Sequence, residues 1–511
     1  MSINIKYNEA THEIEASFKY DLEIINKLKQ IPNVRWNPES KTWIIPDLMF
    51  QALEDRFKGE IVYMTPKWEI TGEAPPDYSK IYAHIQNKPV NLKPPYSPYP
   101  FQAFGANFLV EQAKRYKFAC LFDDMGTGKT LMSIAGAMIL NNEMNLLKYT
   151  IPILVVCKSG LKYQWVTDGI NKFTDATSIV IDGTKAKRKK IYDSIKKMKP
   201  YEYVVIGYET LREDAELLKN IDIGLIISDE AHKVRNHETQ ANKAMCKLKA
   251  EYKFFLTGSP ISGEPDGMFG LGTIGDKKFF GTWNKFKDKF LVFEKTRYGL
   301  DKVGCKNLDI LKEDIDKVSL RRTDKEIAMQ MPKIISQDIK IEMSGIQRAI
   351  DEAIQQDCHT LNLRLETVMS TKDPVKRTQE RQQLEGALKG MMNLRVGAAD
   401  SPELFQLSNS PAVRNKYGAM VNQFNNKSGK LEYLKEHVKE IVESGNKVVI
   451  FTKFETMVRI MFRELSKIKN IGDIATFTGQ MSALDKENSR IKFKTSSTCN
   501  IFIATNAGAE G

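Results

Sequence analysis

The stretch LFDDMGTGKTL, residues 121–131, joins the end of an apolar run to a glycine-rich turn and a Gly-Lys-Thr triplet. A strand, such a turn and a helix N-terminus together point backbone amides at an anion, as phosphate-binding loops do. FACLF before the turn predicts the strand, and TLMSIAGAMIL after it predicts the helix. The usual loop pattern, G-x-x-x-x-G-K-[ST], has a glycine where this chain has Asp123. A helix-opening turn with an incidental lysine is therefore the alternative interpretation.

The phosphate-loop interpretation gives each residue of the turn a task. Gly126 and Gly128 let the backbone approach a phosphate closely, with Thr127 between them. Lys129 would place its ammonium on the β- and γ-phosphates, and Thr130 would ligate Mg²⁺. This interpretation predicts a binding site for a nucleotide and Mg²⁺.

A second motif follows about 100 residues later, in LIISDEAHKVRN. An apolar strand ends there in two carboxylates, Asp229 and Glu230. Asp229 suits Mg²⁺, and Glu230 suits orienting and deprotonating an attacking water. His232 is either coupled to this motif or a metal ligand, with His237 as the nearest second histidine.

Strand-like apolar runs alternate with helical stretches from about residue 101 to 280, and again from about 428. The first set comprises 118–122, 153–157, 203–206, 225–227 and 254–256, and the second 447–452, 474–479 and 500–505. Nearly continuous hydrophobicity indicates strands buried on both faces, as in parallel sheets covered by helices. The charged stretch between the two sets reads as helical. We therefore predict two α/β lobes separated by a helical insert.

Three segments in order, DDMGTGKT, SDEAHKVRN and LTGSPI, resemble motifs I, II and III of superfamily 2 helicase-type ATPases. Within that group they resemble the SNF2 branch, which also lacks the first glycine of the phosphate loop, so Asp123 fits. The resemblance implies that Lys129, Asp229 and Glu230 are catalytic. It also implies that Ser259, in the third motif, couples hydrolysis to motion.

Further segments are similar to that family in the family's order. PYPFQAFGANFL resembles the Q motif and makes Gln102 the expected adenine contact. PILVVCKSGLKYQW resembles motif Ia, which makes Lys158 a candidate DNA contact. VSLRRTDKEIAMQMPK resembles a block with paired arginines. Arg321 and Arg322 are thus expected either to contact DNA or to brace the hinge between the lobes.

The resemblance covers residues 100–511 and implies an α/β fold of two RecA-like lobes with a helical SNF2-type insertion, plus a small N-terminal α+β domain. FIATNAGAEG resembles the start of motif V, and motif VI with its arginine fingers would come after Gly511. We therefore expect the second lobe to be incomplete and hydrolysis to be weak. The expected domains are 1–90, a proline-rich linker 91–100, lobe 1 at 101–280, the insertion at 281–425 and lobe 2 at 426–511.

The N-terminal stretch FKYDLEIINKLKQIPNVRWNPESKTWIIP resembles the HARP domain of annealing-helicase SNF2 proteins, with a small structural hairpin unit as the alternative. Apolar spacing predicts a helix that ends at Pro32, followed by a hairpin around residues 37–40. Trp36 and Trp43 are candidates to stack on unpaired bases. Their odd spacing would place them on opposite faces of one strand, with one in the core.

A net charge of +12 suits a polyanionic partner, here double-stranded or branched DNA. The lysine-rich stretch 184–199 is either a DNA contact or a solvated helix face. The six cysteines are scattered, which fits a reducing compartment. No apolar run is long enough to span a membrane. We expect a cytoplasmic protein of a bacterium or of a phage-infected cell.

These features favour an ATP-dependent, duplex-DNA-stimulated translocase of SNF2 type, which anneals strands or remodels forks. A strand-separating helicase of the same superfamily is the first alternative. A non-catalytic DNA-binding protein is the second.

Overall fold

The structure is a computed structural model that describes residues 3–505 except 10, 19, 66, 72–77, 199–200, 260–264, 297–298, 328–336, 370–373 and 422–427. It divides into two compact units, Met1–Lys333 and Ile334–Gly511. Parts of the predicted motifs fall outside the described residues: Pro260 and Ile261 of LTGSPI, the end of the paired-arginine block, and the motif V residues after Thr505.

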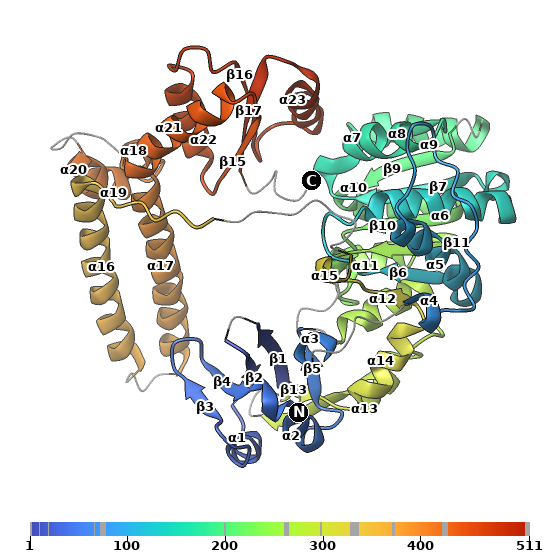
Figure 1. Cartoon of the computed structure of the whole chain (residues 1–511), viewed down its shortest axis with the longest axis horizontal. Coiled ribbons are helices and arrows are strands. Elements are labelled where there is room, and N and C mark those ends of the chain that lie inside the picture. The colour runs from blue at the N-terminus through green and yellow to red at the C-terminus, as the bar shows by residue number, and fades with distance from the viewer. Residues whose placement is uncertain are drawn as a thin grey trace. The chain divides into compact units, whose positions relative to one another are not determined.

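A parallel sheet of seven strands, in the order β14-β6-β11-β10-β7-β9-β8, forms the centre of the first unit (Figure 1). All five predicted strands of lobe 1 are confirmed. The strands are β6 Phe118–Leu121, β7 Ile151–Cys157, β8 Ser178–Val180, β9 Tyr203–Gly207, β10 Asp222–Asp229, β11 Lys249–Leu256 and β14 Ser319–Leu320.

Helices cover both faces of this sheet, because alternate strand residues point to opposite sides and both sides are apolar. In β6, Phe118 and Cys120 enter one core, and Ala119 and Leu121 enter the other. Helices α5 Pro100–Tyr116 and α6 Lys129–Met144 cover the second face, with α7 Lys162–Gln164, the π-helix Trp165–Ile170 and α8 Asn171–Phe173. The first face carries α9 Lys185–Met198, α10 Tyr208–Leu218, α11 Gln240–Met245, α12 Gly267–Gly275, α13 Trp283–Phe290 and α14 Leu308–Asp316.

Lobe 1 extends beyond the boundary expected at residue 280. Strand β14 pairs in parallel with β6 as the edge of the sheet, and Leu311 and Val318 are buried in the core of lobe 1. The hairpin of β12 Leu291–Thr296 and β13 Gly299–Cys305 belongs to this unit, as does the short α15 Asp324–Ile327. The two-residue β14 has no periodicity of its own, so only its pairing with β6 identifies it as a strand.

The N-terminal segment folds as a five-stranded sheet in the order β3-β4-β2-β1-β5. The predicted helix is α1 Leu22–Lys29, and the predicted hairpin is β3 Arg35–Asn37 with β4 Thr42–Pro46. Trp36 and Trp43 lie opposite each other on these two neighbouring strands, so the expectation of opposite faces of one strand was wrong. Their ring centroids are 5.5 Å apart. The other elements here are β1 Ile3–Asn8, β2 Glu13–Ser17, β5 Ile61–Tyr63, α2 Phe50–Arg56, α3 Lys67–Thr71 and α4 Tyr78–Ile81.

The proline-rich segment 91–100 packs on lobe 1. The Lys93 amide donates to the Phe173 carbonyl at 2.9 Å, and the rings of Tyr96 and Phe173 lie 5.4 Å apart. Pro100 is the first residue of α5, a position where proline's missing amide hydrogen costs nothing.

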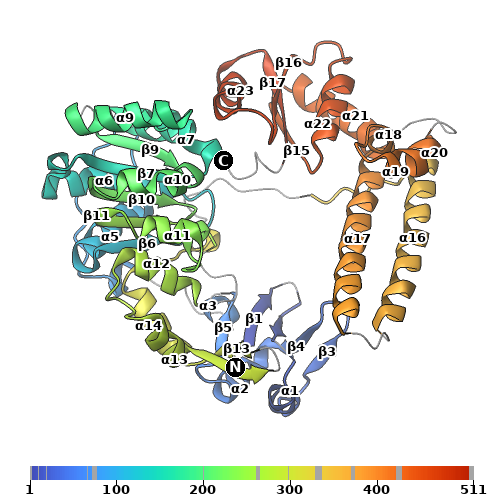
Figure 2. The same ribbon diagram turned by 180° about the vertical axis from the view of Figure 1, so that it is seen from behind.

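The second unit contains a long antiparallel helix pair and a three-stranded parallel sheet, β15-β17-β16. The helices α16 and α17 run side by side in both views (Figures 1 and 2), and Arg395 donates to Asp351 across them at 2.7 Å. All three predicted strands are confirmed. The elements are α16 Gly345–Met369, α17 Pro374–Asp400, α18 Glu403–Gln406, α19 Pro411–Val413, α20 Ala419–Val421, α21 Gly429–Glu443, β15 Val448–Thr452, α22 Glu455–Leu465, β16 Asp473–Phe477, α23 Ala483–Thr495 and β17 Cys499–Thr505.

Within the described parts of both units, none of the helices has the length and hydropathy needed to cross a membrane. All six cysteines are free.

Candidate nucleotide-binding site

The predicted motifs meet at the carboxyl-terminal edge of the lobe 1 sheet. Strands β14, β6, β11 and β10 are consecutive in the sheet, and all four are parallel. Their carboxyl ends therefore bring together Arg322, Asp123, Thr257 and Asp229, which are distant in sequence. This edge is where ligands bind in open parallel α/β sheets.

The phosphate loop turns sharply from β6 into α6. Gly126 and Gly128 have φ values of 84° and 87°, in the left-handed region that glycine occupies without strain. A Cβ atom on Gly128 would lie 2.5 Å from Nε2 of Gln102, so no other residue fits there unless Gln102 moves. Thr127 is buried, and its hydroxyl donates to the carbonyl of Asp124 at 2.9 Å.

Lys129 bends back over its own loop. Its Nζ donates to the carbonyl oxygens of Asp123 at 2.7 Å and Asp124 at 2.8 Å. Burial lowers the pKa of Lys129, and the carboxylates of Asp123, Glu230 and Asp229 oppose that shift. Lys129 is thus near enough to Asp229 and Glu230 for their carboxylates to act on its pKa.

Gln102 is 8% exposed and joins the start of α5 to the loop. Its Nε2 donates to the Thr127 carbonyl at 3.0 Å, and its Oε1 accepts from the Tyr99 amide at 3.0 Å. The exposed Tyr99 ring stacks on Phe101, with 6.1 Å between the ring centroids. The predicted adenine contact therefore lies next to the loop and beside an exposed aromatic ring.

Asp229 is oriented by a residue that the sequence analysis did not single out. The buried Trp165 donates its indole Nε1 hydrogen to Oδ2 at 2.8 Å, and the Glu230 amide donates to Oδ1 at 3.0 Å. The Tyr208 hydroxyl donates to the main-chain oxygen of Asp229 at 2.6 Å. Burial raises the pKa of Asp229, and the Trp165 hydrogen bond acts against that rise. Trp165 is the last residue of the motif Ia segment, which is the only sequence signal for it.

Glu230 and His232 connect the second motif to the third. Glu230 has φ 50°, which is rare for a residue with a side chain. Nδ1 of His232 lies 3.0 Å from Oε2 of Glu230 and 3.2 Å from Oγ1 of Thr257. The Thr257 hydroxyl in turn accepts from the amide of the exposed Ser259 at 3.2 Å. The hydrogen bond from His232 lowers the pKa of Glu230, against the effect of burial.

These contacts place His232 within the nucleotide motifs. In the described residues, no group of three or more His, Cys, Asp and Glu side chains is arranged to hold a metal ion. Magnesium characteristically binds one or two protein oxygens together with substrate phosphates. Asp229, and Thr130 in the half-buried first turn of α6, fit that kind of site.

The paired arginines have different surroundings. Arg322 is 3% exposed, and its Nη2 lies 2.5 Å from Oδ2 of the fully buried Asp123. This position favours a bracing role over contact with DNA.

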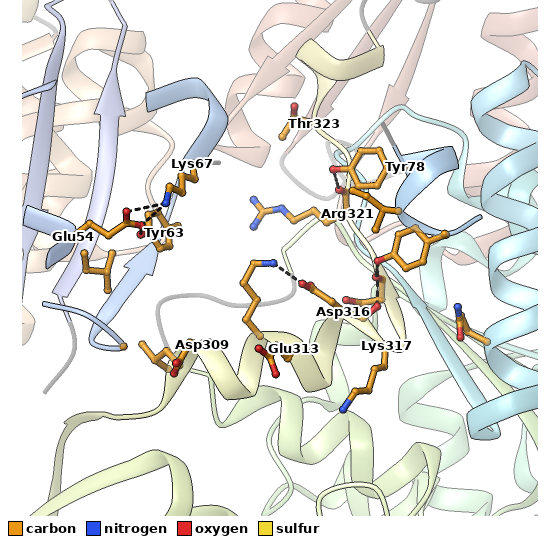
Figure 3. Close-up of a pocket in the computed structure, with 18 of the residues that line it drawn as sticks. Glu54, Tyr63, Lys67, Tyr78, Asp309, Glu313, Asp316, Lys317, Arg321 and Thr323 are labelled. Atoms are coloured by element: carbon orange, nitrogen blue, oxygen red, sulfur yellow. Dashed lines mark hydrogen bonds and ion pairs between the residues drawn. The ribbon is translucent and has the colours of Figure 1, made fainter. Parts of the chain in front are cut away.

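Arg321 is exposed, and Figure 3 shows its side chain directed into a pocket of about 1170 Å³ that is lined by the N-terminal segment, α4, α14 and the residues after β14. No residue of the phosphate loop lines this pocket. Lys158, at the end of β7, is half-buried, and burial together with Lys233 lowers its pKa. Among the described residues, only Lys158 and Arg321 thus remain of the three predicted DNA contacts.

A parallel α/β lobe with a Gly-Lys-Thr loop and a strand ending in Asp-Glu defines the class of nucleotide-binding helicase-type lobes. The SNF2-related domain matches residues 101–397, and the helicase conserved C-terminal domain matches residues 429–511. The chain belongs to the SNF2-related family and has the two RecA-like lobes of superfamily 2 helicase-type ATPases.

Several curated proteins are similar to this chain. The putative ATP-dependent helicase/translocase YwqA of Bacillus subtilis is 24% identical over 81% of this chain and 41% of its own length. The DNA annealing helicase and endonuclease ZRANB3 of Bos taurus is 28% identical over 48% of this chain and 22% of its own. Protein CHROMATIN REMODELING 5 of Arabidopsis thaliana is 25% identical over 72% of this chain and 20% of its own length. The chain thus spans less than half the length of each of these relatives.

Among solved structures, the Sulfolobus solfataricus SWI2/SNF2 ATPase core in complex with dsDNA is 25% identical. The match covers 82% of this chain and 80% of that one, with a TM-score of 0.43.

Proposed function

We propose that this chain is an ATP- and Mg²⁺-dependent translocase of SNF2 type that is stimulated by double-stranded DNA and acts on duplex or branched DNA. The observation that carries the proposal is the meeting of Lys129, Asp229 and Glu230 at one sheet edge. The net charge of +12 supports a DNA partner. The HARP-like N-terminal stretch and the similarity to an annealing helicase support a role in annealing or fork remodelling.

The catalytic residues divide the task of hydrolysis among them. Lys129 would leave the two loop carbonyls and donate to the β- and γ-phosphates, while Gln102 meets the adenine ring. Glu230 would orient the attacking water and accept its proton, with His232 holding the carboxylate in place. Bound Mg²⁺, held by Asp229 and Thr130, would neutralise charge that develops on the phosphates.

Coupling of hydrolysis to movement would start from the same contacts. Glu230 reaches Thr257 through His232, and Thr257 accepts the amide hydrogen of Ser259. A shift of Glu230 during hydrolysis would therefore be felt at Ser259. This path gives a physical basis to the coupling role that the third motif implied.

The decisive experiment measures ATP binding and steady-state hydrolysis, with and without duplex DNA, in the wild type and in Lys129→Ala. We expect the substitution to lower turnover by about 10²-fold or more, since it removes a preorganised donor to the transferring phosphate. Lys219→Ala, which changes an exposed lysine of the same lobe, is the matched control and should leave turnover unchanged. Equal turnover in Lys129→Ala and the wild type would refute the site.

Two further assays separate the alternatives. Displacement of a triplex-forming strand without unwinding of a forked duplex is expected of a translocase. Robust fork unwinding would instead indicate a strand-separating helicase. DNA binding with no ATP binding would indicate a non-catalytic DNA-binding protein.

A further inference from the structure

Asp123 occupies the place of the first glycine in the usual phosphate loop, and its side chain is fully buried. A buried carboxylate is costly unless it is paired and hydrogen-bonded. Burial raises the pKa of Asp123, and the Arg322 guanidinium acts against that rise. The residue is therefore tied to a partner, and the partner comes from 199 positions further along the chain.

Arg322 meets Asp123 with both its main chain and its side chain. The Arg322 amide donates to Oδ1 at 2.9 Å, and Nη2 donates to Oδ2 at 2.5 Å. The other terminal nitrogen, Nη1, donates to the carbonyl of Phe101 at 2.7 Å. A Cβ atom on Gly105 would lie 2.9 Å from Nη2, so the guanidinium uses the space that this glycine leaves open.

These bonds hold the phosphate loop at two points. The main-chain oxygen of Asp123 accepts from Nζ of Lys129, so Arg322, Asp123 and Lys129 form one continuous chain of contacts. Phe101 precedes Gln102, whose side-chain amide donates to the Thr127 carbonyl in the middle of the loop. Arg322 thus anchors the loop entrance directly and the loop centre through the start of α5.

We propose that Arg322 is a positioning residue for nucleotide hydrolysis, and that its pair with Asp123 sets the location of the Lys129 ammonium relative to the phosphates. The inference rests on the proposed ATPase function and adds a residue to it. It assigns Arg322 to the nucleotide site, whereas the sequence left DNA contact open. A misplacement of about 1 Å in a reacting geometry can cost about 10²-fold in rate, so loss of the pair should be felt in turnover.

The test compares Asp123→Gly, Arg322→Met and the double variant. Asp123→Gly restores the usual glycine but leaves Arg322 without its anion, and the double variant removes both charges. We expect each single variant to lower kcat about tenfold or more, with a smaller change in KM for ATP and with Kd for duplex DNA within about twofold of the wild type. The kcat of the double variant should be no lower than that of the worse single variant, because the two residues act as one unit. Arg322→Lys keeps the positive charge but not the planar guanidinium with its several donors. Its kcat should lie between those of Arg322→Met and the wild type.

Arg188→Met is the matched control, because Arg188 makes a comparable buried pair with Asp214 in the same lobe, with Nε donating to Oδ2 at 2.7 Å. It should lower Tm while leaving kcat at saturating DNA within about twofold. Equal falls of Tm and kcat in Arg188→Met and Arg322→Met would overturn the inference and leave Arg322 a merely structural residue. A weakened DNA affinity with unchanged kcat in Arg322→Met would also overturn it, in favour of DNA contact.

The outcomes for the wild type separate this inference from the proposed function. A wild type that binds no ATP overturns both. If the wild type hydrolyses ATP and the Asp123 and Arg322 variants are equally active, this inference alone is overturned. If the wild type binds ATP without turnover, the same variants are compared by titration with a fluorescent ATP analogue, and affinities equal to that of the wild type overturn the inference.

Discussion

Trp165 donates its indole hydrogen to Oδ2 of Asp229 at 2.8 Å, across 64 positions of sequence. The tryptophan opens a π-helix, Trp165–Ile170, a rare conformation that often occurs at functional sites. The amide of Glu230 holds the other carboxylate oxygen. The orientation of Asp229, the predicted magnesium ligand, is therefore set by a residue in the connection between β7 and β8.

Trp165→Phe should lower kcat about tenfold and raise the Mg²⁺ concentration needed for half-maximal activity. Phenylalanine keeps most of the apolar volume but removes the hydrogen-bond donor, which frees one oxygen of Asp229 to rotate. A magnesium titration of ATPase activity measures both effects. Trp283→Phe changes a tryptophan of the aromatic cluster with Phe269 and Phe286 and serves as control. An unchanged magnesium dependence in Trp165→Phe would rule out the orienting role.

His232→Ala should move the acidic limb of the kcat–pH profile to higher pH. The hydrogen bond from His232 lowers the pKa of Glu230, so its removal lets that pKa rise toward the ordinary value. A general base with a raised pKa becomes protonated at a higher pH, and activity then falls earlier as the pH is lowered. His359→Ala, on the exposed side of α16, is the control. A shift of the acidic limb in the opposite direction would contradict the assignment of Glu230 as base.

Gln102→Ala should raise KM for ATP about tenfold with a smaller change in kcat, and should narrow the preference for ATP over GTP. The side-chain amide is the expected adenine contact, and it also donates to the Thr127 carbonyl in the loop. Competition between ATP and GTP measures the preference. Gln112→Ala removes a second buried glutamine of α5, which contacts His84 rather than the loop. Equal effects of the two substitutions would indicate that Gln102 stabilises α5 and does not contact adenine.

The lysine-rich helix α9 is held by a buried cation and presents its lysines to solvent. Arg188 is 8% exposed and bound to Asp214, whereas Lys185, Lys189 and Lys196 are exposed. Changing these three lysines to Gln should weaken binding to duplex DNA. The slope of log K against log salt should become shallower by about 0.9 for each DNA phosphate that the helix no longer neutralises.

The control for α9 removes the same amount of charge elsewhere on lobe 1. It consists of changes to Gln at three exposed lysines, Lys219, Lys247 and Lys277. Fluorescence anisotropy at several salt concentrations gives both slopes. Identical slopes in the two triple variants would indicate that the lysines of α9 form a solvated helix face and do not contact DNA.

Trp36 and Trp43 should separate into a binding residue and a packing residue. Trp36 is 48% exposed, whereas Trp43 packs partly buried against the N-terminal core. Trp36→Ala should weaken binding of single-stranded or forked DNA by roughly 1–3 kcal/mol, the usual value of one base stacked on an aromatic ring. Trp43→Ala should instead lower Tm. Leu48→Ala, at an 87% exposed residue of the same domain, is the control for binding. Unchanged DNA binding in Trp36→Ala would leave the hairpin a structural unit.

Local sequence patterns were enough to predict several features of the fold and of the site. The Gly-Lys-Thr triplet, the strand ending in Asp229 and Glu230, and the apolar runs of both lobes were all readable, because each lies within a dozen consecutive residues. Parallel strands buried on both faces leave a continuous apolar signal, and a phosphate loop needs its glycines at fixed positions. The resemblance to a known family then ordered these pieces into two lobes.

The contacts between residues that are distant in sequence became visible only in the folded chain. The fold placed Arg322 on Asp123, Trp165 on Asp229 and β14 beside β6, because parallel pairing aligns strand ends that no local periodicity relates. It also separated Arg321 from Arg322, since neighbouring side chains in an extended segment point in opposite directions. The aspartate that departs from the usual phosphate loop is thus explained by an arginine 199 positions away, a relationship that local sequence patterns do not encode.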